Sequence, residues 1–455
     1  MRKNNYQSLT EGKPFRVLIR FAIPFLLSGL LQMAYSTVDV YFIGNYASAG
    51  ALAGAYQGTF INAIITYFFI GLAMGGTILL GQHVGAKHDE SAAKTVGNII
   101  WVSFLSVIAT TLLVTILGRS IITLLRVPPE AVDEAWNYLR VCCYGYVFIM
   151  GYNVVSAVLR SLGDSKAPFI FVLISSVTNI ILDYVFVCRM QMAAKGAAIG
   201  TISAQGLSFL VSLVYIKTKG LPFRFRLQDI RFDGKYIREI LKLGIPISLQ
   251  STLNNLSFVI VGALINTMGV YVAASNSIVG NISALAMIIP MAFQSAISAI
   301  TAQNIGAKQI DRAIRTFWYG VLVSLVITLP LVIVMDFWPE TVVSILTKDP
   351  DVIRESVRFL YPYSWDCLFV CLVFCANGFF NGCGKTTFSM LQEGLSAFLV
   401  RIPFSFLFRY LIPNATIFHV GLGTPLASFA SAIACVIYYR ARFTKEQLER
   451  MEIPD

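Results

Sequence analysis

The feature that most constrains this chain is a series of twelve apolar stretches, each long enough to cross a lipid bilayer. A membrane-spanning helix needs about 20 predominantly apolar residues. The stretches, with boundaries good to a few residues, are 17–43, 51–80, 96–117, 136–158, 168–187, 196–216, 240–266, 271–300, 317–335, 356–380, 387–411 and 417–439. Hydrophobic residues make up 56% of the chain and charged residues 13%, too little charge to coat a water-soluble particle. We predict an all-α membrane protein with twelve transmembrane helices.

The basic residues predict how these helices are oriented. If both termini lie inside, the inner segments carry 25 Lys and Arg and the outer segments nine, and this excess marks the cytoplasmic side. The outer nine are Arg119, Arg126, Arg140, Arg189, Lys195, Lys348, Arg354, Arg358 and Arg409. The net charge of +11 is therefore assigned to membrane orientation, and no nucleic-acid partner is expected. The first stretch is too long for a signal peptide and is expected to stay in the mature protein.

The sequence contains an internal duplication. Three motifs recur at an offset of 221 or 222 residues: Ile23-Pro24 as Ile245-Pro246, residues 81–87 as 302–308, and residues 160–165 as 381–386. Each half therefore holds six spans, and both halves enter the membrane in the same direction. We predict two six-helix lobes, residues 1–216 and 240–455 with a short cytoplasmic tail, joined by a basic cytoplasmic linker at 217–239. A pseudo-two-fold axis along the membrane normal would relate them, as in carriers that bind substrate between their halves.

Four ionisable residues lie inside predicted spans: Asp39, Asp183, Asp366 and Arg401. Each costs several kcal/mol unless it is paired or hydrated. Asp39 and Asp183 lie roughly 27 Å and 22 Å along their outward-running spans, at 1.5 Å rise per residue. No Lys or Arg of the first half lies in a span at that depth, so the two carboxylates are expected to hold a proton or a cation. The alternative is that each only ends its helix near the outer interface.

Polar neighbours of this acidic pair suit a coupling ion. Asn179 lies one helical turn before Asp183, and Thr201 offers another oxygen from the next span. Oxygen ligands at Asp39, Asp183, Asn179 and Thr201 would suit Na⁺, whereas paired carboxylates suit H⁺. No Cys or His spacing typical of zinc is present, so no bound metal other than Na⁺ is expected.

The second half carries a different pair. Asp366 and Arg401 are predicted at similar depth near mid-membrane and could form a buried ion pair, either as a structural link or in a drug-binding or gating role. Pro24 and Pro246 occupy matching places in spans 1 and 7, where each removes a backbone hydrogen bond and permits a bend.

Nothing in the chain indicates an enzyme or a nucleotide-driven pump. Gly384-Lys385-Thr386 resembles the end of a phosphate-binding loop, but Phe379 stands where that motif requires glycine. No cofactor is expected, and transport energy would come from an ion gradient.

With these motifs the chain resembles the multidrug and toxic compound extrusion (MATE) family, over about residues 15–442. The matching pieces are the Ile-Pro openings of spans 1 and 7, Thr37-Val38-Asp39, the Gln-x-x-Gly-Ala-Lys loops, Leu159–Asp164 and Asn179–Asp183. The prokaryotic branch similar to DNA-damage-inducible protein F fits best. It implies a bacterial cytoplasmic-membrane protein, expected as a monomer, that exports organic cations in exchange for H⁺ or Na⁺.

The resemblance also implies roles for single residues. Asp39 and Asp183 would be the acidic pair, supported by Tyr138, Asn179 and Thr201, while Gln32 and Asn153 would face the substrate cavity of the same lobe. Asp366 and Arg401 are added as cavity candidates. Other branches carry an acidic residue in span 7, where this chain has Leu253-Asn254-Asn255, so in the second lobe only Asp366 remains for coupling.

Three alternatives stand beside an efflux antiporter. A lipid-linked oligosaccharide or polysaccharide flippase of the same superfamily would need more interior basic residues than Arg401. A major-facilitator carrier also has two six-span halves, but its Asp- and Arg-rich 2–3 loop is missing. A channel or receptor would not be built from such a duplication with buried carboxylates in one half.

Overall fold

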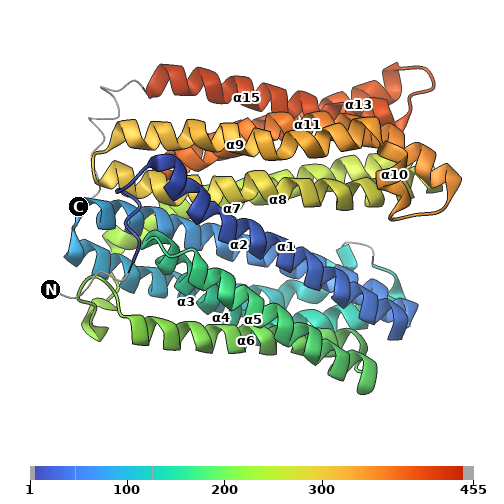
Figure 1. Ribbon diagram of the computed structural model, residues 1–455. Helices are drawn as coiled ribbons and strands as arrows, with labels where there is room; N and C mark the ends of the chain where they lie inside the picture. The colour runs from blue at the N-terminus through green and yellow to red at the C-terminus, as the bar shows by residue number, and fades with distance from the viewer. Residues whose placement is uncertain (1–5, 47, 125–126, 444–455) are drawn as a thin grey trace. The chain divides into compact units, whose positions relative to one another are not determined.

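A computed structural model describes residues 6–46, 48–124 and 127–443 of the chain (Figure 1). Within these residues, twelve helices are long and apolar enough to cross a membrane, so the predicted all-helical, multi-pass membrane fold is confirmed. Arg126 and the predicted tail from residue 444 onwards lie outside the described residues, as do Arg2 and Lys3, which were counted for the orientation.

The helices extend a few residues beyond the predicted spans at most ends. The first half contains α1 Pro14–Tyr46, α2 Ala49–Ala86, α3 Asp89–Leu124, α4 Pro129–Ser161, α5 Lys166–Asp183, the π-helical turn η1 Tyr184–Arg189 and α6 Ala193–Lys219. The short 3₁₀ turn η2 Leu227–Asp229 follows. The second half contains α7 Gly234–Asn266, α8 Val270–Gly306, α9 Ile310–Phe337, α10 Pro339–Ser344, α11 Pro350–Gly382, α12 Thr386–Ser396, the π-helical turn η3 Ala397–Arg401, α13 Ile402–Leu411, α14 Ile417–Gly421 and α15 Gly423–Arg442.

The chain divides into two compact units, but not at the predicted linker. Among the described residues, the first unit contains those at 6–9 and 23–248, and the second contains those at 10–22 and 249–443. Helix α1 therefore belongs to the second unit up to Ala22 and to the first from Ile23, while α7 changes unit after Ser248. The predicted lobes at 1–216 and 240–455 do not include this division of α1 and α7 between the units. Those boundaries were placed at a polar stretch of sequence, and polar composition does not show which neighbours a long helix packs against.

Helix α4 forms the centre of the first unit. It packs against α2, α3 and α6. About two thirds of the residues in its most apolar part are buried. Two glycines of α2 allow the close approach: a Cβ at Gly54 would lie 2.8 Å from the carbonyl oxygen of Ala131, and one at Gly58 would lie 2.7 Å from the ring of Tyr138. In lipid there is no hydrophobic driving force between helices, so their association depends on close packing, which small residues at a crossing permit.

Helix α11 has the matching central place in the second unit. It packs against α8, α9 and α15, and Figure 1 shows these long helices running side by side. A Cβ at Gly378 would lie 2.5 Å from the carbonyl oxygen of Gln294, and one at Gly382 would lie 2.7 Å from that of Ser298. The absence of a side chain at Gly378 and Gly382 therefore permits the close contact between α11 and α8.

The Gly71 and Gly75 pair of α2 does the same in the first unit. A Cβ at Gly71 would lie 2.6 Å from the amide nitrogen of Ser248, and one at Gly75 would lie 2.5 Å from that of Gly244. The first part of α7 is thereby packed backbone to backbone against α2, which explains why it belongs with the first unit.

The basic connection between the halves is folded against α3 and not extended. Lys217 and Lys219 still belong to α6, and α7 begins at Gly234, so the connection is shorter than the predicted 217–239. The Asp233 amide donates to Asn98 Oδ1 at 2.9 Å. The ring of Phe223 is buried in a cluster with Leu80 and Val96.

An ion pair ties the α4–α5 turn to the end of α6. Lys219 Nζ lies 2.5 Å from Asp164 Oδ2, and both side chains are largely buried. The Tyr215 hydroxyl donates to the same oxygen at 2.8 Å, and Asp164 Oδ1 accepts from the Ala167 amide at the start of α5. Burial raises the pKa of the Asp164 carboxyl, but these hydrogen bonds lower it further, so its pKa lies below the ordinary value.

Substitution of Gly378 tests the packing of α11 on α8. Gly378→Ala should lower the free energy of unfolding by about 1–3 kcal/mol, because the added methyl group meets backbone that cannot move aside easily. Thermal unfolding in detergent measures the change. Gly280→Ala in α8 is the matched control, since a Cβ there meets nothing within 4 Å. Equal midpoints for the two variants would contradict the close crossing.

Substitution of Asp164 tests the ion pair. Asp164→Asn should cost about 2 kcal/mol, because Lys219 loses a charged hydrogen-bond acceptor. The folded-state pKa of Asp164 is depressed, so its contribution is present above the unfolded-state pKa and is lost as the pH falls through the folded-state value. Thermal midpoints measured from pH 7 down to acid should therefore converge for the wild type and Asp164→Asn. A constant gap at all pH values would contradict this assignment.

Candidate functional site

Asp183 ends α5 at a break in regular helical geometry. The chain continues as the π-helical turn Tyr184–Arg189, and π segments inside helices are frequent at functional sites. The Asp183 side chain is completely buried. Gly200 of α6 leaves room for it, because a Cβ at that position would lie 2.2 Å from Asp183 Oδ1.

Asp39 of α1 meets this carboxyl group directly. The side chains of Asp39 and Asp183 lie within hydrogen-bonding range of each other. The outer end of α1 also contacts the π-helical turn through Phe42 and Tyr184, whose ring centroids are 6.3 Å apart. The structure therefore brings together the two carboxyls that the depth argument placed at similar levels.

The acidic pair has unused acceptor capacity. Asn179 Nδ2 donates to Asp183 Oδ2 at 3.3 Å, but Asp39 Oδ1, Asp183 Oδ1 and Asn179 Oδ1 are buried without a donor. Two carboxyls can hydrogen-bond to each other only when one of them carries a proton, because an ionised carboxylate has no donor. The arrangement can hold a proton between the carboxyls, or a small cation on the three free oxygens.

Tyrosine side chains surround the pair. Tyr138 of α4 is 5% exposed, and its hydroxyl hydrogen-bonds with Thr59 of α2 and lies near Asp39. Tyr35, one turn before Asp39 on α1, interacts electrostatically with both carboxyls and with Tyr152. Tyr35 is not among the residues predicted from the sequence, although its spacing of four residues from Asp39 places both on one face of α1.

The described contacts do not link the other residues predicted for this lobe to the two carboxyls. Thr201 is half-buried beside Gly200, and the described contacts include no hydrogen bond from it to either carboxyl. Asn153 of α4 is buried, and its Nδ2 donates to the Ile149 carbonyl oxygen of its own helix. Gln32 lies on an exposed position of α1, two turns before Asp39.

In the second unit, the expected ion pair between Asp366 and Arg401 is not formed. Arg401 Nη1 donates to Asn254 Oδ1 at 2.7 Å and to Ser257 Oγ at 2.5 Å, while Asp366 hydrogen-bonds with Ser428. Their charges interact only at longer range. Equal depth did not produce contact because the two side chains leave their helices toward different neighbours.

Arg401 also closes a π-helical turn, Ala397–Arg401. The fifth span of each half therefore has π geometry beside its buried ionisable residue. The guanidinium lies over the ring of Phe258, with its carbon 4.1 Å from the ring centroid. Glu393 of α12, a residue that was not predicted from the sequence, accepts hydrogen bonds from Gln250 and Asn377.

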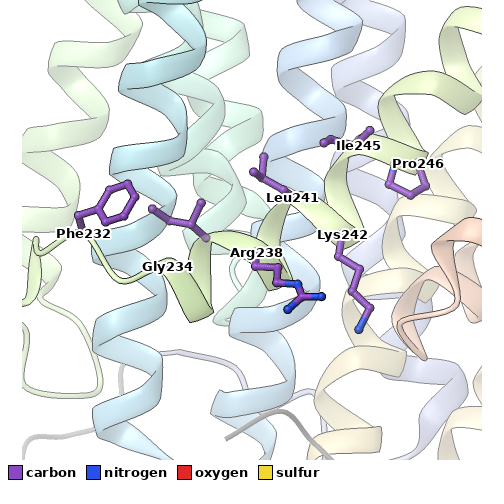
Figure 2. Close-up of a pocket in the computed structure, with 8 residues that line it drawn as sticks. Phe232, Gly234, Arg238, Leu241, Lys242, Ile245 and Pro246 are labelled. Atoms are coloured by element: carbon purple, nitrogen blue, oxygen red, sulfur yellow. The ribbon is translucent and has the colours of Figure 1, made fainter.

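The two prolines predicted as bend points lie inside uninterrupted helices. Pro24 is within α1 and Pro246 within α7, each within a few residues of the place where its helix changes unit. Bending itself stays a prediction. Pro246 also lines an open hollow at the start of α7, with the apolar side chains of Ile237, Leu241 and Ile245 (Figure 2). None of the predicted ionisable site residues lies there.

Comparison with known proteins identifies the family of the chain. The MatE family model matches residues 24–185 and again 246–407, which confirms the internal duplication. The chain is 28% identical to the "Probable multidrug resistance protein YpnP" of Bacillus subtilis, covering 95% of this chain and 96% of that protein. It is 25% identical to the "Probable multidrug resistance protein YoeA" of the same organism, covering 98% and 97%.

A solved structure has the same fold. An outward-facing multidrug resistance MATE family transporter of the MOP superfamily superposes with a TM-score of 0.91 at 19% identity, covering 97% of this chain and 98% of that one. The two matches of the family model together cover most of the chain. The chain belongs to the MatE family, the multidrug and toxic compound extrusion transporters.

Proposed function

We propose that this protein exports organic cations and amphiphilic drugs across the cytoplasmic membrane of a bacterium in exchange for H⁺ or Na⁺. Relatives that cover most of the chain carry names of multidrug resistance proteins, and a Staphylococcus haemolyticus relative is named a multidrug export protein. The observation that carries the coupling mechanism is the contact between Asp39 and Asp183.

This contact supports coupling because it has no basic partner. The interactions of Asp39 and Asp183 among the described residues involve each other, Asn179, tyrosines and Cys188, and no Lys or Arg. A buried pair of carboxyls that was only structural would be expected to have a fixed cation beside it. Here the compensating charge has to come from an exchangeable ion.

The drug and the ion need not bind the same atoms. They need only stabilise opposite conformations of the carrier, because linkage then makes each weaken the binding of the other. In this scheme Asp39 and Asp183 carry the ion, with Tyr138, Asn179 and Thr201 around them. Gln32 and Asn153 contact the drug, and Pro24 and Pro246 are the places where α1 and α7 bend.

The two candidate coupling ions, H⁺ and Na⁺, would occupy the free oxygens of this site in different ways. A single shared proton satisfies the contact between the two carboxyls. Na⁺ would use Asp39, Asp183, Asn179 and Thr201, whose oxygens are the ligand type that a hard cation prefers. No tightly held cofactor is involved, and the protein acts as a monomer without catalysing a covalent reaction.

The flippase alternative is weaker. A lipid-linked pyrophosphate would need several free basic side chains in the interior. Arg401 is the basic candidate in the second unit, and its Nη1 is already engaged by Asn254 and Ser257.

Neutralising the acidic pair tests the coupling. Asp39→Asn should reduce ion-driven export of tetraphenylphosphonium from proteoliposomes by about tenfold or more, within the usual range of coupling between two sites. Asp183→Asn should do the same. Both should still bind the drug, because the amide resembles the protonated carboxyl.

The same assay identifies the ion when the pH gradient and the Na⁺ gradient are imposed separately. Asp133→Asn is the matched control, since that carboxyl lies on the surface beside Arg119. Export by Asp39→Asn at the wild-type rate would refute the assignment and would move the coupling site to Asp366.

The proposed orientation is tested by labelling single cysteines. Arg224→Cys, in the connection between the halves, should react with an impermeant maleimide in inverted vesicles but not in intact cells. Lys195→Cys, at the start of α6, should show the reverse pattern. Both are made in a Cys188→Ser chain, because the other seven cysteines are buried. Labelling of Arg224→Cys from outside would overturn the model with both termini in the cytoplasm.

A further inference from the structure

An open apolar hollow lies at the start of α7, where the connection between the halves reaches the predicted span. Its volume of about 560 Å³ falls within the range of about 300–1,000 Å³ that is typical of ligand sites. Leu241, Ile245 and Pro246 of α7 line it, together with Phe232 from the residues before that helix. Ile245 is 40% exposed and Phe232 is 63% exposed. An apolar group that enters the hollow can therefore cover both side chains.

Contacts with α3 fix the wall that Phe232 forms. The ring of Phe232 meets that of Trp101 edge-on, with the ring centroids 6.3 Å apart. The amide of the next residue, Asp233, donates to Asn98 Oδ1 at 2.9 Å. All of these residues and those that line the hollow belong to the first unit. The hollow is therefore a feature of that folded unit and does not depend on a free loop.

Two basic side chains border the hollow. Arg238 and Lys242 line it one helical turn apart on α7, and Figure 2 shows both extending to the same side of that helix. Lys242 Nζ lies 3.4 Å from a carboxyl oxygen of Glu239, whereas the described contacts give Arg238 no acidic partner. Residues 217–242 contain eight Lys and Arg against three Asp and Glu. The border of the hollow therefore carries an excess of positive charge.

The basic and apolar parts of the hollow follow one another along α7 as the headgroup and acyl chain of a phospholipid do. Arg238 precedes Ile245 by about 10 Å at 1.5 Å rise per residue, and the predicted span begins between them. Long basic side chains at a helix end extend toward the lipid headgroups. Clusters of about four to eight Lys and Arg on the cytoplasmic side of a transmembrane helix are typical of sites for anionic lipids. A soluble acidic peptide would match the charge but not the apolar wall.

We propose that this hollow binds one anionic phospholipid of the inner leaflet, with the headgroup phosphate on Arg238 and Lys242 and an acyl chain along Ile245. The site goes beyond the proposed export function, because it uses none of the residues that are proposed to hold the drug or the ion. Its assignment to the inner leaflet rests on the proposed orientation, which the cysteine labelling tests separately.

Lipid binding to the purified full-length protein tests the site. Native mass spectrometry from an uncharged detergent measures the dissociation constant of the first bound lipid, for phosphatidylglycerol and for phosphatidylcholine with the same acyl chains. Phosphatidylglycerol should bind about tenfold or more tightly, because only its headgroup has a net negative charge. Arg238→Gln/Lys242→Gln should weaken its binding by about twentyfold, or roughly fivefold for each charge.

Two further variants separate the hollow from a general attraction between basic residues and anionic lipid. Arg224→Gln removes a charge from the same connection but outside the hollow, and it should bind phosphatidylglycerol like the wild type. Ile245→Trp fills the hollow and keeps both charges. It should weaken both lipids by about fivefold or more, because the acyl chain loses apolar contact, and it serves if the double variant does not fold.

An excess of glycerol 3-phosphate or of poly-glutamate distinguishes a lipid from a free phosphate and from an acidic peptide, and neither should displace phosphatidylglycerol. Displacement by either, or equal affinity for the two lipids, would overturn the proposal. So would unchanged binding in the double variant or in Ile245→Trp, or a loss in Arg224→Gln as large as in the double variant. Export is not measured, so these outcomes are separate from a failure of the proposed coupling.

Discussion

The hydrocarbon core of a bilayer offers no hydrogen-bond partners, and the rest of this structure depends on that constraint. Every backbone donor and acceptor within the membrane has to be satisfied internally, which leaves helices as the economical solution for a chain of this composition. Lipid also removes the hydrophobic drive for helices to associate, so tight contact has to come from shape. The glycines at 54, 58, 71, 75, 378 and 382, each meeting a neighbouring helix, meet that need.

The same constraint makes each interior charge informative, and the two units handle their charges differently. In the first unit, two carboxyls lie in contact, and the described residues place no Lys or Arg beside them. In the second unit, Arg401 is surrounded by neutral acceptors and an aromatic ring, while Asp366 and Glu393 have partners of their own. A duplicated scaffold has thus acquired two different polar interiors.

Local helix geometry contributes to both interiors. A π-helical turn follows Asp183 and another ends at Arg401. Such π-helical segments are rare in helices and are frequent at functional sites. The motif appears in the fifth span of each half, although the sequences of these turns, Tyr184–Arg189 and Ala397–Arg401, are not alike.

Sequence alone predicted the twelve spans, the duplication and the similar depth of Asp39 and Asp183, because hydropathy, repeat spacing and depth are all one-dimensional quantities. Only the tertiary structure decided what depends on direction around a helix axis. Asp366 and Arg401 share a depth but leave toward different neighbours. Glu393 lies near the start of its span, where a charged residue is common. Only the structure shows that Gln250 and Asn377 donate hydrogen bonds to its carboxylate. The division of α1 and α7 between the two units likewise depends on which helices they pack against. The order of residues along the chain does not show these contacts directly.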